Sequence, residues 1–153
     1  MNYSGIYKIS QKITITTTLT LLQIKAGATT PFELIRASVT NASVETSDTM
    51  HIQLLRKSSA ATVTALTPLL LRPSDAAADA VGGTAATGHT ASVEGTDTDV
   101  LDEEGVNVLN GYHYLPVPEE RPIIVGAGFI ALRSVITIAS TDLVCVMVFG
   151  ELA

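Results

Sequence analysis

Near the C-terminus the chain carries the run LVCVMVF, residues 143–149, which contains no charged or hydroxyl side chain. Its three valines favour a β-strand, because branching at Cβ fits the pleated surface of a sheet. Successive side chains of a strand point to opposite faces, so both faces of this strand are apolar and both must be covered. We therefore predict a central strand with one face against a partner sheet, while Val144, Val146 and Val148 contact a neighbouring subunit.

The same run holds the single cysteine of the chain, Cys145. One cysteine excludes an intrachain disulfide, and its apolar neighbours indicate a small buried residue rather than a nucleophile. The sequence has no Gly-x-Ser-x-Gly segment, and its three histidines do not have the spacing of zinc ligands. We therefore predict neither a catalytic residue nor a cofactor.

Further strands are predicted upstream by alternation and by β-branched residues. From Ile13 to Leu21 apolar residues alternate with threonine, which is typical of a strand with one face in water. Other predicted strands cover residues 32–39, 50–57, 63–71, 89–93, 106–109 and 129–138. About eight short strands separated by turn signals predict an all-β fold, an antiparallel two-sheet sandwich of jelly-roll type.

Three segments depart from this pattern. Residues 74–81 follow a proline, begin with an N-capping serine and stop at a glycine, which predicts one short helix. The proline-rich segment 116–122 is expected to cross an end of the fold as an extended arm, because proline disfavours both a helix and a central strand. The polar residues 1–10 are expected to form an N-terminal arm, followed by a single β-sandwich domain over residues 11–153.

Length and composition limit the function classes. The 153 residues are enough for one domain, 46% of them are hydrophobic, and the formal net charge is −6. Only nine lysines and arginines occur, scattered singly, so nucleic acid is not an expected partner. The longest run without a charged or polar side chain, Ile123 to Leu132, is about half of the ~20 residues that a membrane-spanning helix needs. No signal peptide is recognised, and we expect folding in a host cytoplasm, without a membrane partner.

Six carboxylates lie between Glu94 and Glu104. They favour a solvated acidic turn, because like charges on a loop tip keep neighbouring particles apart. The alternative is a weak Ca²⁺ site, since a hard cation prefers several oxygen ligands from one flexible loop. The candidate ligands are Asp97, Asp99, Asp102 and Glu104.

The sequence Tyr112-His113-Tyr114 is expected to form a short strand. Aromatic side chains with polar tips line faces that bind glycans or another subunit, so these three residues are a candidate partner or glycan face. The alternative is an ordinary edge strand with amphipathic side chains.

In the order of these pieces the chain resembles the small jelly-roll virion proteins of tailed bacteriophages, the capsid decoration or head-surface proteins. The resemblance extends from about Tyr7 to Leu152 and rests on structural turns rather than a catalytic motif. The segments that carry it are Leu54-Leu55-Arg56, Thr67-Pro68-Leu69, Pro73 to Ala77, Gly111 to Pro122 and Gly150-Glu151-Leu152.

The resemblance implies a non-enzymatic virion structural protein that forms a homotrimer and stabilises the lattice of a major capsid protein at the capsid surface. Two other functions are compatible with a sandwich of this kind. One is a carbohydrate-binding module, and the other is a phage tail or fibre component with the same fold.

Overall fold

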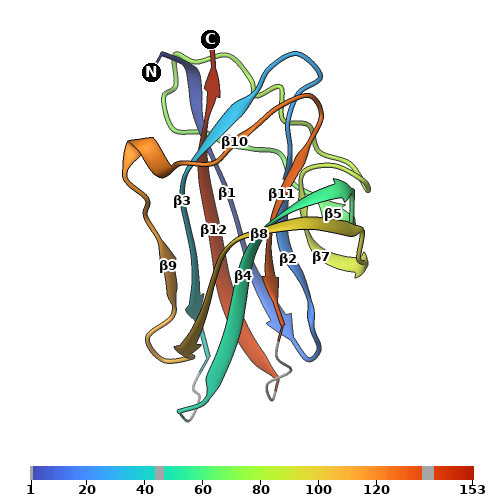
Figure 1. Cartoon of the computed structure of the whole chain (residues 1–153), viewed down its shortest axis with the longest axis vertical. Helices are drawn as coiled ribbons and strands as arrows, with labels where there is room; N and C mark the ends of the chain where they lie inside the picture. The colour runs from blue at the N-terminus through green and yellow to red at the C-terminus, as the bar shows by residue number, and fades with distance from the viewer. Residues whose placement is uncertain (1, 44–46, 136–139) are drawn as a thin grey trace.

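The structure is a computed structural model that describes residues 2–43, 47–135 and 140–153. Two antiparallel sheets pack face to face and leave almost no helix, so the predicted all-β sandwich is confirmed (Figure 1). Both termini lie at the same end of the sandwich (Figure 1). Within the described residues, no helix is long and apolar enough to cross a membrane.

One sheet, called here the β12 sheet, has the strand order β10-β3-β12-β1-β6, and β9 also pairs with β3. Its strands are β1 (Tyr3–Ile15), β3 (Phe32–Asn41), β6 (Leu69–Leu70), β9 (Tyr112–Tyr114), β10 (Ile123–Ile124) and β12 (Thr141–Leu152). The other, the β11 sheet, has the order β5-β7-β2-β11-β4-β8. Its strands are β2 (Leu19–Lys25), β4 (Thr49–Ser59), β5 (Thr62–Ala65), β7 (Gly88–Val93), β8 (Thr96–Asn107) and β11 (Phe129–Ser134).

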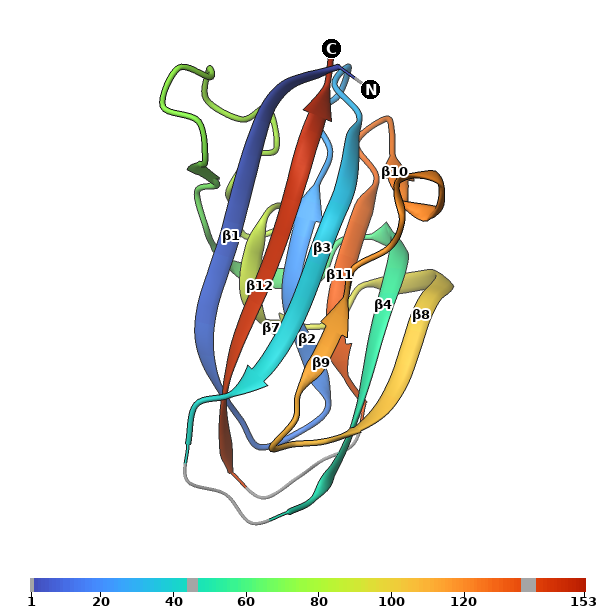
Figure 2. The same cartoon turned by 90° about the vertical axis from the view of Figure 1, so that its left-hand side faces the viewer.

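The strand orders identify the sandwich as a jelly roll. The four strands β9-β3-β12-β1 face the four strands β2-β11-β4-β8, so consecutive strands cross repeatedly from one sheet to the other (Figure 2). This is the pattern of two interleaved Greek keys. The small strands β5, β6, β7 and β10 extend the edges of these two sheets.

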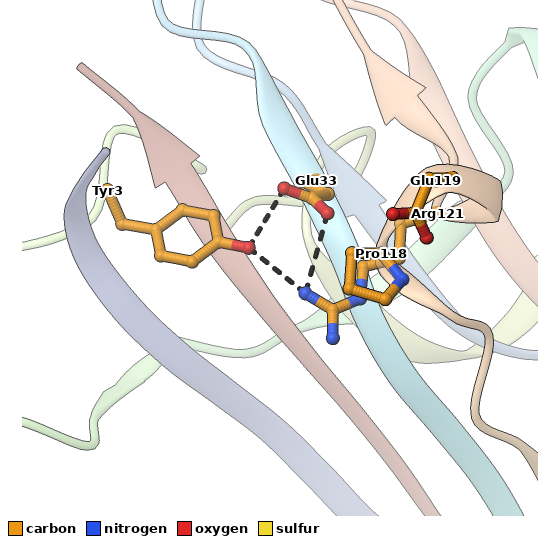
Figure 3. A pocket seen from close by; sticks show the side chains of 5 residues that line it. All are labelled: Tyr3, Glu33, Pro118, Glu119 and Arg121. Atoms are coloured by element: carbon orange, nitrogen blue, oxygen red, sulfur yellow. Dashed lines mark hydrogen bonds and ion pairs between the residues drawn. The ribbon is translucent and has the colours of Figure 1, made fainter. Parts of the chain in front are cut away.

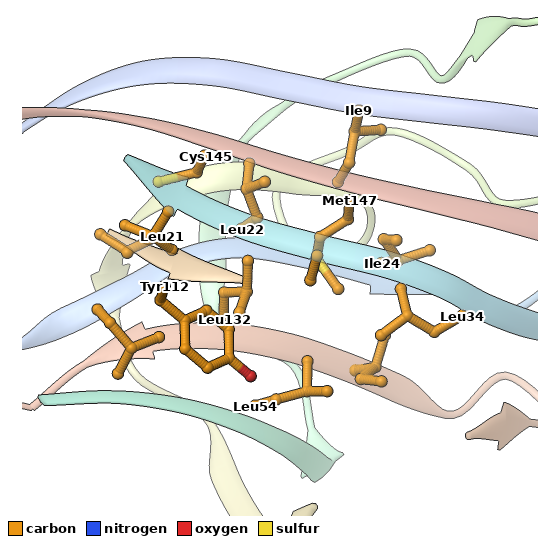
Figure 4. Close-up of a cluster of buried hydrophobic side chains, with 14 of the residues drawn as sticks. Ile9, Leu21, Leu22, Ile24, Leu34, Leu54, Tyr112, Leu132, Cys145 and Met147 are labelled. Atoms are coloured by element: carbon orange, nitrogen blue, oxygen red, sulfur yellow. The ribbon is translucent and has the colours of Figure 1, made fainter. Parts of the chain in front are cut away.

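The C-terminal strand is central, as the apolar run predicts. Met147 of β12 lies opposite Ile9 of β1 on one side and Ala37 of β3 on the other. The odd positions from Leu143 to Phe149 are fully buried between the sheets. Their neighbours in the core come from strands of both sheets (Figure 4).

Two aromatic contacts organise one end of this core. The ring centroid of Phe149 lies 5.5 Å from that of Tyr7 and 5.1 Å from that of Phe32, both in tilted arrangements. Cys145 lies deeper in the core, where burial raises the pKa of its thiol to about 12. The thiol therefore stays protonated and serves as a small apolar residue.

The predicted helix over residues 74–81 is wrong, because this segment forms turns and bends. Its backbone groups pair with other parts of the chain: the Tyr7 hydroxyl donates to the Ala76 carbonyl at 2.9 Å, and the Ala80 amide donates to Glu151 Oε1 at 2.8 Å. Asp75 accepts a hydrogen bond from the Ile6 amide of β1. These long-range contacts outweigh the local helix propensity.

The predicted N-terminal arm is also absent. Residues 3–10 are the first part of β1, which pairs with β12 along its whole length from Tyr3 to Ile15. The predicted strand from Ile13 to Leu21 is two strands, because residues 16–18 form an exposed bend between β1 and β2. Alternation with threonine predicts strand residues but not where the strand ends. The adjacent Thr16, Thr17 and Thr18 are compatible with both a continuous strand and a bend.

Two further predictions need correction. The acidic segment is not a turn but most of β8, a 12-residue strand that pairs with β4. The proline-rich segment does not cross an end of the fold: it runs along the edge of β3 between β9 and β10, and includes the 3-10 turn η1 (Pro118–Glu120). Proline at the first position of such a turn loses no hydrogen bond, which is why the turn forms here.

Candidate functional site

The outer face of the β12 sheet carries a row of three valines. Val144, Val146 and Val148 point away from the core, opposite the buried odd positions of the same strand. Val144 and Val146 are partly exposed, whereas Val148 is 4% exposed. In Figure 2 no described backbone segment crosses in front of β12, so Val144 and Val146 stay partly exposed, whereas neighbouring side chains cover Val148. We call these valines and the outward residues beside them on β1 and β3 the valine face.

The register shows which residues border each valine. Polar residues of β1 and β3 flank Val144 and Val146: Lys12, Thr40, Ser10 and Ser38. Val148 lies between two cations, Lys8 of β1 and Arg36 of β3. The valine face is therefore a narrow apolar strip bordered by hydroxyls and positive charge.

The valine face carries positive charge, although the protein as a whole is acidic. Lys12 has a partner, because its Nζ lies 3.1 Å from Asp142 Oδ2. Hydrogen bonds from Thr14 and Lys12 lower the pKa of Asp142. Within the described part of the chain, Lys8 and Arg36 form no salt bridge. A protein with a net charge of −6 thus presents two unpaired cations on one sheet face.

A shallow pocket of about 480 Å³ lies at the end of the same sheet near the termini (Figure 3). It is lined by Tyr3, Glu33, Pro118, Glu119 and Arg121. The Tyr3 hydroxyl donates to Glu33 Oε2 at 2.8 Å, and Arg121 Nη1 lies 3.5 Å from Glu33 Oε1. Burial and the neighbouring Glu33 carboxylate raise the pKa of Tyr3, although Arg121 lowers it.

The close approach of Tyr3 depends on a glycine. A Cβ at Gly150 would lie 2.5 Å from Tyr3 Cδ1, so only glycine lets the ring lie against β12. Glu33 is 1% exposed and is neutralised by Arg121 from the proline-rich segment. The cluster thereby joins the start of β1, the start of β3 and η1, which indicates a structural clasp.

The structure separates the four candidate Ca²⁺ ligands. Asp97 lies near the start of β8 opposite Lys57 of β4, whose Nζ approaches its Oδ1 to 2.7 Å, and Arg133 donates to its Oδ2. Asp99 is 3.8 Å from a guanidinium nitrogen of Arg56. Two cations already compensate Asp97, so its oxygens are committed to ion pairs.

The remaining two point elsewhere. Asp102 turns toward the core and accepts a hydrogen bond from the Tyr112 hydroxyl at 2.6 Å, while Glu104 is exposed. Among residues 2–43, 47–135 and 140–153, no group of three or more potential metal-binding side chains occurs. An extended strand with register shifts explains this separation, because the four residues are spread over eight positions of β8 at about 3.3 Å per residue.

The predicted aromatic face does not form. Tyr112 is fully buried, and burial together with the Asp102 hydrogen bond raises its pKa far above the ordinary value. Tyr114 points to the same side and packs partly against the core, so only His113 is exposed. Because the two tyrosines stand at alternate positions of β9, both are drawn into the interior.

Sequence reasoning missed a second exposed feature, the segment that follows β9. Leu115 is 74% exposed and Val117 is 55% exposed, and both precede the exposed carboxylates Glu119 and Glu120. We call residues 115–120 the acidic arm. Its signal in the sequence is the alternation of leucine and valine with proline, which keeps the chain extended and prevents it from folding back over its own apolar side chains.

Comparison with protein-family models, with curated proteins and with solved structures gave no match.

Proposed function

We propose that this protein is a non-enzymatic virion structural protein, which self-associates as a homotrimer and stabilises a lattice of major capsid protein at the capsid surface. The observation that carries the proposal is the valine face. Two partly exposed valines, Val144 and Val146, on the central strand of a sheet are unusual, because the outward side of such a strand is normally polar.

The valine face is suited to repeated contacts between rigid subunits. β12 pairs on both sides with long strands, so its valines are held on a backbone that changes little on binding. Each Å² of apolar surface removed from water contributes about 25 cal/mol, and many copies in a shell multiply a small contact. The cations at the border of the strip favour a partner with negative charge.

Light scattering coupled to size-exclusion chromatography tests self-association. The wild-type chain is expected to have three times the subunit mass of 16.0 kDa, and Val146→Asp to have the mass of one subunit, because the charge cannot be buried without a partner. Val93→Asp is the matched control, since Val93 is 63% exposed and lies on β7. A monomeric wild type, or a Val146→Asp variant with unchanged mass, would contradict the proposal.

Co-sedimentation tests the location. Wild-type protein is expected to pellet with purified capsid shells and not with isolated tails. Pelleting with tails instead would favour the alternative of a tail or fibre component. The alternative of a carbohydrate-binding module depended on an exposed aromatic face. Tyr112 is buried and Tyr114 is partly buried, so this face is not available to a glycan.

A further inference from the structure

The acidic arm has the surface chemistry that complements the valine face. Leu115 is the most exposed large hydrophobic side chain among the described residues, and Val117 follows two positions later. Glu119 and Glu120 come next, and in the described chain neither forms a salt bridge. The arm thus offers apolar side chains followed by free negative charge.

The valine face offers the same two features with the opposite charge. Its apolar strip from Val144 leads to Val148, which lies between the unpaired cations Lys8 and Arg36. If the arm packed on this face, apolar side chains would meet apolar side chains and the two carboxylates would meet the two cations. Such a contact is complementary both in hydrophobicity and in charge.

The spacing of the apolar side chains also matches. Val144 and Val146 are two residues apart on a strand, which corresponds to about 7 Å. Val117 has φ −63° and ψ 155°, a polyproline-like conformation, so Leu115 and Val117 are about 6 Å apart along the chain before η1 turns at Pro118–Glu120. With Leu115 and Val117 on Val144 and Val146, the η1 carboxylates Glu119 and Glu120 would lie on the side of the cations.

The acidic arm does not reach the valine face of its own chain. It runs from β9 to β10, and both of these strands pair with β3 on the side away from β12 (Figure 2). Each chain therefore presents one arm and one free face on the same sheet. Contacts between two different surfaces run head to tail, and they close into a ring when the rotation between copies permits it.

We propose that the acidic arm of one copy docks on the valine face of the next copy. Leu115 and Val117 pack on the valine row, and Glu119 and Glu120 pair with Lys8 and Arg36. This inference rests on the proposed self-association and specifies the second surface of that contact.

Charge reversal with sedimentation velocity at low salt tests the contact. Lys8→Glu with Arg36→Glu is expected to weaken association about tenfold or more, and Glu119→Lys with Glu120→Lys to do the same. Lys25→Glu is the control charge reversal, because Lys25 lies at the end of β2 in the other sheet, away from both surfaces. Leu115→Asp provides a variant without folding cost, since its side chain is already exposed, and it is also expected to dissociate the oligomer.

The decisive experiment combines the charge reversals of both surfaces in one chain. A chain carrying all four reversals is expected to associate again, because each reversed arm then meets a reversed face. Association that survives both double reversals, or a fourfold variant that stays monomeric, would overturn the proposed docking. If Val146→Asp dissociates the oligomer while the charge reversals do not, the valine face remains the contact and only its proposed occupant is wrong.

Discussion

Lys57 Nζ lies 2.7 Å from Asp97 Oδ1, and the lysine side chain is completely shielded from solvent. The shield is the β7–β8 turn, in which Glu94 bonds Thr20 of β2 and approaches Lys57 of β4 to 3.4 Å. This turn therefore lies over the outer face of the β11 sheet, where Leu55 and Ala131 are also buried. The two sheets thus differ, because one has its outer face covered by its own chain and the other does not.

Removing the buried cation should destabilise the fold strongly. Lys57→Ala removes the fully buried cation from Asp97 and Glu94, which keep Arg133 and Thr20 as partners, and a loss of about 2–3 kcal/mol in the free energy of unfolding is expected. The adjacent Arg56→Ala is the control, because Arg56 is 41% exposed and only 3.8 Å from Asp99, and it should cost at most about 1 kcal/mol. Urea unfolding of both variants measures the difference, and equal losses would contradict a structural role for the buried pair.

Stability should fall in acid through Asp97. Burial alone would raise the pKa of this carboxyl, but the hydrogen bonds and charges of Lys57 and Arg133 lower it below its ordinary value. A lowered folded-state pKa contributes stability above the unfolded value of about 3.9, and this contribution is lost as the pH falls through the folded-state pKa. Melting temperatures from pH 7 to 2 should show a smaller acid loss in Asp97→Asn than in wild type. An unchanged acid loss would assign it to other groups.

Glu151 should act in the opposite direction. Burial raises the pKa of its carboxyl, an effect that the hydrogen bond from Ala80 only partly offsets. The ionised form is thus disfavoured in the fold, so this group reduces stability above its folded-state pKa and the penalty disappears as pH falls. Glu151→Gln keeps an acceptor for Ala80, and its melting temperature should exceed that of wild type at pH 7 but not in acid. Glu104→Gln, at an exposed site, should show no such difference.

The turn between β10 and β11 contains a strained residue. Gly126 and Ala127 have φ of 57° and 59°, and the Gly128 amide donates to the Val125 carbonyl at 3.0 Å. Two left-handed central residues define a type I′ turn, in which asparagine is favoured over alanine. Ala127→Asn should therefore raise the free energy of unfolding by about 0.5–1 kcal/mol. Ala85→Asn, in an exposed turn without positive φ, should not, and a destabilised Ala127→Asn variant would contradict the argument.

The sequence by itself determined the fold class and the central place of β12. Both follow from local patterns, because side chains of a strand alternate between two faces and a strand that is apolar on both must lie inside a sheet. The burial of Cys145 follows from the same run. The three valines on the outer side of β12 could also be named in advance, since their positions follow from the alternation alone.

Only the tertiary structure decided how distant segments use their side chains. The acidic segment is a strand because β4 provides its hydrogen-bonding partners, and residues 74–81 are not a helix because Tyr7 and Glu151 take up their backbone groups. Tyr112 can be buried because its hydroxyl donates a hydrogen bond to Asp102. In each case a partner outside the segment itself supplies the free energy that overrides the local preference, and no pattern within the segment contains that partner. That the valine face and the exposed acidic arm belong to the same sheet is likewise visible only in the tertiary structure.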